Sequence, residues 1–175
     1  MNITIRKEKE EDYRKVEEVA REAFWNLYFP GANEHCAINK LRKDSAFLPE
    51  LTHVIEVEGE IVGSIFYSRS KVVAPDGTEH ETISFGPVSI LPSYHRQGLG
   101  RKLITHSIEE AVFLSDRVLV LSTKPGSLIA DIDIELPRPR QLALKQSGAC
   151  FSYTNEIRKM LARITQEAAE RELSQ

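Results

Sequence analysis

The sequence from Ile83 to Leu103 reads ISFGPVSILPSYHRQGLGRKL, and this stretch decides the fold. An apolar, strand-like run ends at Leu91-Pro92, a short polar turn follows, and a glycine-spaced loop leads directly into a helical pattern. Backbone N–H groups gather at such a helix N-terminus, where the helix dipole favours an anion. Gly98 and Gly100 lack a Cβ and let the backbone approach a bulky ligand. The stretch therefore predicts a site for a phosphate-bearing cofactor.

The composition bounds the class of protein. A length of 175 residues favours one domain with a substantial core. The net charge of -3 argues against a general nucleic-acid binder, because there is no basic excess to neutralise phosphates. Cys36 and Cys150 lack CxxC spacing and the histidines lack paired metal-ligand spacing, so we expect no disulfide and no metal site. With no signal peptide and no apolar run of roughly 20 residues, a cytoplasmic protein without a membrane span is expected.

Apolar periodicity predicts the order strand, helix, helix and three further strands ahead of the glycine loop. The expected ranges are a strand at 3–6, helices at 13–24 and 34–43, and strands at 54–57, 61–73 and 79–91. Glu58-Gly59 and Pro75-Asp76-Gly77 are hairpin signals between these strands. Pro87 lies inside the last of them and predicts a bulge or an unpaired edge, because proline has no N–H to donate.

Beyond the loop, the pattern predicts a helix over 99–114, a strand over 117–121, a turn over 123–127 and a strand over 128–136. Pro137 and Pro139 should stop the ladder there. Residues 141–153 look irregular, and a terminal helix follows with Thr154 as its candidate N-cap.

The glycine loop does not match either of two common nucleotide-binding motifs. The dinucleotide fingerprint needs a third glycine and a place after the first strand of a βαβ unit, and the phosphate loop of nucleotide hydrolases needs a G-K-[ST] end. The segment His95-Arg96-Gln97-Gly98-Leu99-Gly100 instead resembles the Q/R-x-x-G-x-G/A signature of the GNAT family of N-acetyltransferases, with His95 in the place of Gln or Arg. The element order agrees over about residues 1–110. This resemblance implies an α/β fold with a mixed central sheet and flanking helices, followed here by an atypical C-terminal part.

The resemblance implies acetyl-coenzyme A as co-substrate. Its pyrophosphate would lie on the N–H groups of the glycine loop, amid positive side chains, and its pantetheine arm would pair along the strand before the loop. A backbone N–H near Val88 or Ser89 would steady the oxyanion when an amine attacks the thioester. The implied cofactor-binding residues are Val88, Ser89, Ile90, Arg96, Gln97, Gly98, Leu99, Gly100, Arg101 and Lys102.

No catalytic residue is assigned. The family often protonates the leaving thiolate with a tyrosine after the fifth strand, and no tyrosine follows residues 117–121 at that distance. Glu79 and Glu81 fit either a base acting through water or a solvated strand face. Trp25, Tyr28 and Phe29 lie in the loop that lines the acceptor site in this family, although core packing is the favoured prediction for them.

A second resemblance begins within the helix after the loop. Residues 105–140 are similar to the switch-histidine region of ATP-binding cassette ATPases of the nitrate, sulfonate and taurine importer group, with His106 at the place of the histidine that contacts the ATP γ-phosphate. The chain lacks the P-loop and the Leu-Ser-Gly-Gly-Gln signature of an ATPase, so ATP hydrolysis by this chain is not expected. The two resemblances suggest a chimera with an acetyl-CoA-binding domain at 1–122 and an atypical hairpin and helix at 123–175.

Three functions follow from these patterns. The first is an N-acetyltransferase that moves an acetyl group from acetyl-CoA to a small-molecule or peptide amine. The second is a CoA-binding module without turnover, and the third is a fusion that carries an inactive ATPase fragment. Homodimer formation is compatible with each of them.

Overall fold

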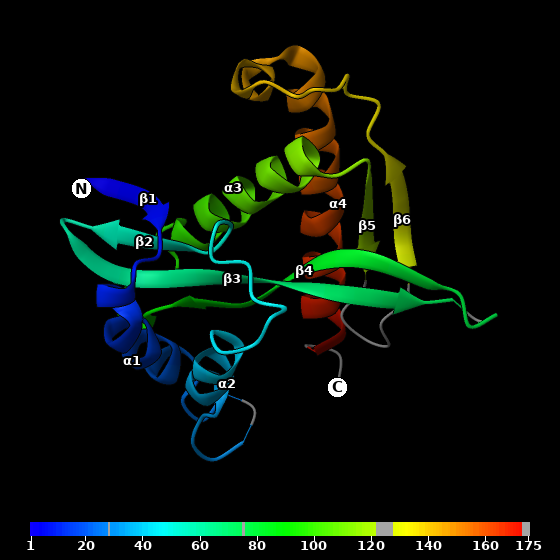
Figure 1. Ribbon diagram of the computed structural model, residues 1–175. Helices are drawn as coiled ribbons and strands as arrows, with labels where there is room; N and C mark the ends of the chain where they lie inside the picture. Colours follow the sequence, from blue (N-terminus) through cyan, green and yellow to red (C-terminus); the bar gives the residue numbers. More distant parts are fainter. Residues whose placement is uncertain (28, 75, 122–127, 173–175) are drawn as a thin grey trace. The chain divides into compact units, whose positions relative to one another are not determined.

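The computed structural model describes residues 1–27, 29–74, 76–121 and 128–172 (Figure 1). Contacts group the chain into two compact units, Met1–Leu103 and Ile104–Gln175, which divide inside helix α3 (Leu99–Leu114). The domain boundary at 122/123 stays a prediction, and the turn expected at 123–127 lies outside the described residues. Among the residues described, no helix is both long and apolar enough to cross a membrane.

The first unit is built on a four-stranded sheet. Its strands, in order across the sheet, are β1 (Ile3–Lys7), β2 (His53–Val57), β3 (Glu60–Val73) and β4 (Glu79–Ile90). Short 3-10 turns precede α1 and follow β4, at Glu10–Asp12 (η1) and Pro92–Tyr94 (η2). Glu58 and Gly59 close the β2–β3 hairpin with positive φ angles of 52° and 86°, as their sequence predicts. The α/β class is confirmed by this sheet and the helices that flank it, whereas every pairing among its described strands is antiparallel where a mixed sheet was expected.

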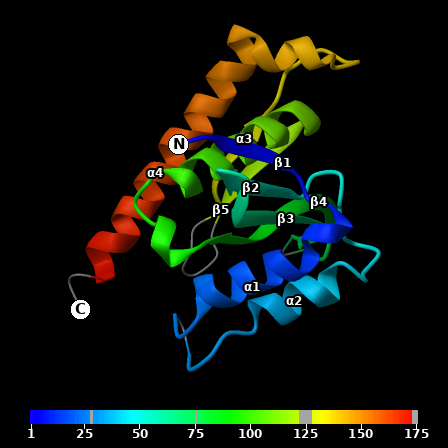
Figure 2. The same cartoon turned by 90° about the vertical axis from the view of Figure 1, so that its left-hand side faces the viewer.

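Helices α1 (Tyr13–Phe24) and α2 (Glu34–Leu41) lie side by side along one face of this sheet (Figures 1 and 2). The alternation of β3 explains how the sheet serves two cores, because successive side chains point to opposite faces. Phe66 packs with Val16 and Ile38 of the two helices, whereas Ile65 belongs to a cluster that contains Leu99. Burying a side chain of this size stabilises the fold by roughly 1.5–3 kcal/mol.

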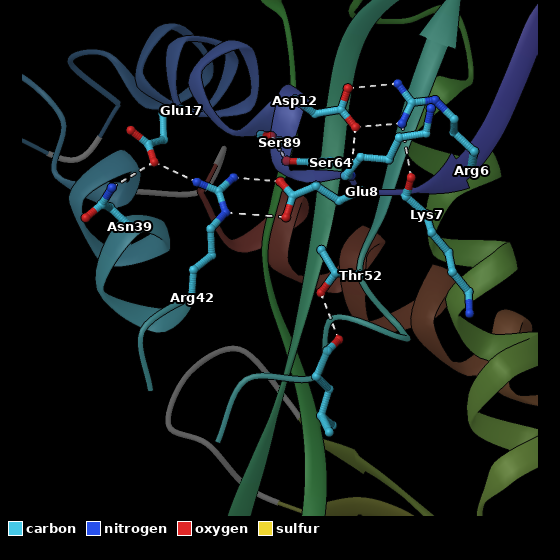
Figure 3. Close-up of polar contacts among 12 residues, drawn as sticks. Arg6, Lys7, Glu8, Asp12, Glu17, Asn39, Arg42, Thr52, Ser64 and Ser89 are labelled. Atoms are coloured by element: carbon cyan, nitrogen blue, oxygen red, sulfur yellow. Dashed lines mark hydrogen bonds and ion pairs between the residues drawn. The ribbon is translucent and has the colours of Figure 1, made fainter. Parts of the chain in front are cut away.

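A buried ion network joins α2 to the rest of the first unit (Figure 3). The guanidinium of Arg42, only 5% exposed, donates to Glu8 after β1 and to Glu17 of α1, with closest distances of 2.6 Å to each. It also lies 4.0 Å above the ring of Tyr13. Burial raises the pKa of Glu8 above its usual value, while the hydrogen bonds from Arg42 act in the opposite direction. The network fixes the end of α2 against α1 and β1.

The second unit has its own core. Strand β5 (Arg117–Leu121) pairs antiparallel with β6 (Leu128–Asp133), and Val120 packs with Val112 of α3 and Ile157 of α4 (Gly148–Glu172). The strand ends at Asp133, three residues before the predicted Leu136. The Ile134 N–H still donates to the carbonyl of Asp116, the residue just before β5, and α3 ends at Leu114, so no β5 residue remains to pair further along.

Arg140 is the polar centre of this unit. Its guanidinium donates to the carbonyls of Val112, Phe113 and Ser115 at the end of α3, the last at 2.7 Å. It also donates to the carbonyls of Ile134 and Leu136. The last carbonyls of a helix lack intrahelical partners, so this buried arginine caps α3 and holds the chain after β6 against it.

The terminal helix begins earlier than the sequence pattern indicates. Residues 148–153 are helical, so the irregular structure predicted for this part of 141–153 and the N-cap predicted at Thr154 are wrong. Thr154 is buried inside α4, and its hydroxyl donates to the carbonyl of Cys150. Ser147 occupies the capping position, since its Oγ accepts the N–H of Cys150 at 3.2 Å. The stretch from 142 to 146 forms a further 3-10 turn, η3 (Leu142–Gln146).

Candidate functional site

A cavity of about 490 Å³ lies in the first unit, at the end of β4 and beside the glycine loop. Three parts of the chain line it: the end of α1 with the residues after it, the last residues of β4, and the segment from η2 into α3. The lining residues are Ala23, Phe24, Leu27, Val88, Ile90, Tyr94, His95, Arg96, Gly98, Leu99, Gly100 and Arg101.

The outer edge of β4 beside this cavity pairs with none of the described strands, and we call it the free edge. β4 is the last strand of its sheet, and the Leu91 N–H donates to the carbonyl of Val62 on the β3 side at 2.8 Å. Because backbone groups alternate in direction along a strand, the groups of Ser89 also face β3, and those of Val88 and Ile90 face outward. The outward carbonyl of Ile90 contacts Nε2 of His95 at 3.0 Å, which agrees with this assignment. Of the two predicted positions, Val88 is thus the one whose N–H faces the free edge.

The predicted irregularity at Pro87 is confirmed as a bulge. Val88 pairs with Ile65 and Phe85 pairs with Tyr67, so two β4 residues stand opposite a single residue of β3. A bulge of this kind bends the strand and re-aims the residues that follow it. Here those residues are the ones that line the cavity.

Contact between β3 and β4 depends on Gly63. A Cβ added there would lie closer than 3.0 Å to both the carbonyl oxygen of Ser89 and the Cδ1 of Ile90. The hydroxyl of Ser89 turns toward the buried hydroxyl of Ser64 at 2.8 Å, away from the cavity lining. Ser89 therefore fixes the strand that forms the cavity wall.

The glycine loop takes the backbone through left-handed conformations before α3. Arg96 has a φ of 62° and Gly98 a φ of 79°. A Cβ on Gly98 would meet nothing within 4 Å, so this glycine is needed for its backbone angle. α3 starts at once, since the Lys102 N–H donates to the carbonyl of Gly98 at 3.0 Å. The loop thus ends in the helix N-terminus that an anion would need.

Seven of the ten predicted cofactor residues line the cavity together, and three do not. Those in the lining are Val88, Ile90, Arg96, Gly98, Leu99, Gly100 and Arg101. Ser89 faces Ser64, and the Gln97 side-chain amide donates back to the carbonyl of Ser93 at 3.1 Å, so Gln97 braces the turn. Lys102 is exposed on the first turn of α3. The charged residues of the described lining are basic, and none is Asp or Glu.

The sequence prediction missed Ala23 and Phe24 at the end of α1 and Leu27 just after it, which are far from the glycine loop in sequence. The apolar face of α1 extends to Ala23 and Phe24 in its last turn, and this extension is the sequence signal that could have found these two residues. The core packing predicted for Trp25 and Phe29 is wrong, because they are 57% and 43% exposed. Tyr28 lies outside the described residues.

The other predicted candidates do not meet the cavity. Glu79 pairs with Lys71 at 2.6 Å on the exposed β3–β4 hairpin, and Glu81 is exposed nearby on the same strand. Of the described residues, no group of three or more His, Cys, Asp or Glu has a geometry that could hold a metal ion.

Together these features define an α/β protein whose antiparallel sheet ends in a bulged edge strand, a left-handed glycine loop and a helix N-terminus. A family model described as "Acetyltransferase (GNAT) family" matches residues 13–130. The chain therefore belongs to the GNAT family of acetyltransferases.

Solved structures support the same fold. A GNAT family acetyltransferase from Brucella melitensis in complex with acetyl-CoA is 26% identical, with a TM-score of 0.58, over 71% of this chain and 78% of that one. The GNAT family N-acetyltransferase YhbS from Escherichia coli in complex with CoA is 22% identical, with a TM-score of 0.55, over 70% of this chain and 63% of that one. The second likeness concerns the fold alone.

Among curated proteins the similarity is to ATPases over a short segment. The nitrate import ATP-binding protein NrtD of Synechocystis sp. is 40% identical over 65 residues, which are 34% of this chain and 24% of that protein. The chain thus spans about a quarter of the length of this relative. The match agrees with the sequence resemblance to transporter ATPases and with a chimeric origin.

Proposed function

We propose that this chain is a cytoplasmic N-acetyltransferase that transfers the acetyl group of acetyl-CoA to an amine. The observation that carries the proposal is the position of the cavity, which joins a phosphate-type helix N-terminus to the free edge of β4. Few ligands need both features. Coenzyme A does, because it has a diphosphate at one end of its pantetheine arm and amide groups along that arm.

The lining residues fit the parts of this co-substrate. The N–H groups of the loop and the side chains of Arg96 and Arg101 would hold the diphosphate by charge-assisted hydrogen bonds. The outward groups of Val88 and Ile90 would pair with the pantetheine amides as an added strand does. Lys102 contributes positive field from the first turn of α3, and Leu99, which is buried, anchors the turn in the core.

Transfer then requires one bond to form and one to break. The amine nitrogen attacks the thioester carbonyl, the C–N bond forms, and the C–S bond breaks with its electron pair on sulfur. The nitrogen loses one proton and the sulfur gains one, so that the products are an N-acetyl amide and the free thiol of CoA. The Val88 N–H faces the free edge and is our candidate donor to the oxyanion that forms on the way.

Calorimetric titration with acetyl-CoA tests the cofactor site. We expect Gly98→Pro to abolish binding, because proline fixes φ near -65° and the loop needs a positive φ. Gly100→Val should weaken binding, because a Cβ would already be in van der Waals contact with Cγ1 of Ile90 at 3.7 Å and the two further methyl groups of valine would occupy space beside the cavity wall. Gly148→Ala, on the first turn of α4, is the control substitution. Wild-type affinity in both loop variants, with their circular dichroism unchanged, would refute the assignment.

A CoA-binding module without turnover is the second candidate, and the absence of a carboxylate from the described lining favours it. Release of free thiol across a panel of amines separates the two. A protein that binds acetyl-CoA and acetylates no amine is a binder. A protein that binds neither acetyl-CoA nor CoA at high micromolar concentration would leave the third candidate, a fusion with an inactive ATPase fragment.

A further inference from the structure

The bulge at Pro87 divides the outer side of β4 into two parts. The part after the bulge contains Val88 and Ile90, which line the cavity. The part before it, residues 79–85, pairs with β3 alone among the described strands and contributes nothing to the cavity lining. We call the outer side of residues 79–85 the distal edge. The candidate site leaves this edge without a role.

The backbone groups of alternate residues point outward along the distal edge. On β3, the Tyr67 carbonyl and the Arg69 N–H are hydrogen-bonded to the segment 46–48, away from β4. The groups of Ser68 between them therefore face β4, and those of its partner Ser84 face back toward β3. By alternation, the residues whose N–H and C=O groups face outward are Glu79, Glu81, Ile83 and Phe85.

The distal edge is apolar at its centre. Ile83 is 45% exposed and Phe85 is 48% exposed. They stand two residues apart and lie on one face of the sheet, where the Phe85 ring packs 6.1 Å from the ring of Tyr67. Sheets protect an open edge with charges, proline or a bulge, and here Glu81 stands on one side of the apolar pair and Pro87 on the other. The centre itself is an open template for another strand.

We propose that the distal edge pairs antiparallel with the distal edge of a second copy of this chain, with Ile83 on the two-fold axis. In this register Ile83 meets Ile83 of the second copy, and each Phe85 stands diagonally beside it. Glu81, Ile83 and Phe85 of each chain then donate one N–H and accept one across the axis. The contact joins the apolar centres of the two edges and satisfies their outward backbone groups.

Neighbouring registers fit this edge less well. A centre on Glu81 would set two carboxylates directly opposite each other, which is destabilising. A centre on Thr82 would set acidic side chains directly opposite Ile83 and Phe85. A centre one residue after Ile83 would carry Glu81 onto Pro87 of the second copy, which has no N–H and lies in the bulge. The self-complementary register is thus the one centred on Ile83.

This pairing leaves the candidate site accessible. Val88 and Ile90 lie past the bulge, which bends the strand away from the regular ladder, so they take no part in the contact between the copies. One pair of strand segments is a small interface, and we expect a reversible dimer in the micromolar range. Dimer formation neither requires nor hinders acetyl-CoA binding, so it is independent of the proposed function.

Sedimentation equilibrium of the full chain across the micromolar range tests the pairing. We expect a dimer of twice the 19.8 kDa mass of one chain. Ile83→Pro should raise its dissociation constant by at least about tenfold, because it removes an outward N–H from both copies. The ladder to β3 keeps its hydrogen bonds, since the Ile83 N–H does not face that strand. Glu79→Pro is the matched control, because it removes an outward N–H of the same edge that has no partner in this register.

A charge exchange tests the position of the axis. Ile83→Lys and Ile83→Glu should each weaken the dimer, because the residue on the axis meets its own charge. An equal mixture of the two variants should associate at least about threefold more tightly than either alone. Misfolding would not be reversed by mixing. Val73→Lys and Val73→Glu, at a 62% exposed position of β3, should change nothing alone or mixed.

Each outcome supports or overturns the pairing. A chain that stays monomeric throughout the micromolar range overturns it, and so does a dimer that persists in Ile83→Pro with unchanged circular dichroism. Absence of rescue on mixing the two charged variants overturns the register. The backbone amides of Ile83 and Phe85 should exchange more slowly as the protein concentration rises. Protection that is the same at every concentration would show that the edge is covered within one chain, and would overturn the proposal.

Discussion

The substitution Gly63→Ala adds one methyl group where β3 and β4 meet, directly behind the cavity wall. Gly63 is buried and pairs with Ile90 across the two strands. The new Cβ would lie closer than 3.0 Å to the Ser89 carbonyl oxygen and to Ile90 Cδ1, and 3.0 Å from Cγ2 of Ile55. One of these neighbours is backbone, so rotation of a side chain does not relieve the overlap. The end of β4 must move outward.

The cost follows from two terms. Overpacking a well-filled core by one methyl group costs about 1–3 kcal/mol. Moving β4 also weakens a backbone hydrogen bond of the ladder, which contributes about 1 kcal/mol. We therefore expect the free energy of unfolding of the first unit to fall by about 2–4 kcal/mol. The affinity for acetyl-CoA should fall as well, because Val88 and Ile90 lie on the displaced strand.

Urea unfolding followed by circular dichroism is the measurement, since Trp25 is exposed and its fluorescence reports the core poorly. Gly148→Ala is the matched control, because a Cβ there meets nothing within 4 Å and alanine favours a helix. It should leave stability unchanged or raise it by up to about 1 kcal/mol. If Gly63→Ala loses less than about 0.5 kcal/mol, which is the usual limit for surface substitutions, the close approach of the strands does not constrain the fold.

Three further changes probe the parts that support the site. The Arg6 guanidinium lowers the pKa of Asp12 below its ordinary value of 3.8, so this carboxylate stabilises the fold above that pH and the contribution disappears as pH falls below it. Asp12→Asn should cost about 2 kcal/mol at pH 7 and flatten the acid limb of the stability curve, and an unchanged limb would contradict the pairing. Arg140→Lys should speed hydrogen exchange of the backbone amides at the end of α3, because a lysine ammonium cannot reach the same carbonyls at once. Unchanged protection of these amides would contradict the capping role of Arg140. Ser89→Ala should cost about 1 kcal/mol through the unpaired Ser64 hydroxyl, and a larger loss of acetyl-CoA binding than of stability would place Ser89 in the site itself.

Local pattern was sufficient for much of this fold. Short apolar runs predicted the central strands of the first unit, since both faces of β2 and of the first half of β3 are buried and consecutive residues there are apolar. The glycine loop was predicted because Gly98 has a conformational requirement that shows in the sequence. Pro87 predicted the bulge for the same reason, since a residue without an N–H cannot continue a regular ladder.

The features that the sequence did not predict depend on contacts between residues that are far apart in the chain. Phe24 and Leu27, at the end of α1 and just after it, reach the cavity only because α1 packs against the sheet, and the apolar face of the helix does not name that partner in the sequence. Trp25 and Phe29 were placed in the core on hydrophobicity alone. The hydrogen bonds between Asn26 and Gly31 close the loop instead, and Asn26 adopts a φ of 56°, which hydrophobicity does not encode. Thr154 was predicted as the N-cap of α4 because its hydroxyl stands next to the apolar residues of the helix. Ser147 has the same hydroxyl group and is the residue that caps the helix.

Helix α3 explains how two unrelated sequences can be joined without loss of either core. Its first turns place Leu99 and Leu103, four residues apart, in the cluster of the first unit. Its later turns place Ile108 and Val112, again four apart, in the cluster of the second unit. The two residues of each pair share one face of the helix, and the pairs lie five positions apart, from Leu103 to Ile108, so a fusion point between them preserves both cores as long as the helical register is kept. The acetyltransferase family match, which runs through residue 130, and the ATPase resemblance predicted over 105–140 can therefore share one helix, and the glycine loop keeps its helix N-terminus whichever sequence follows.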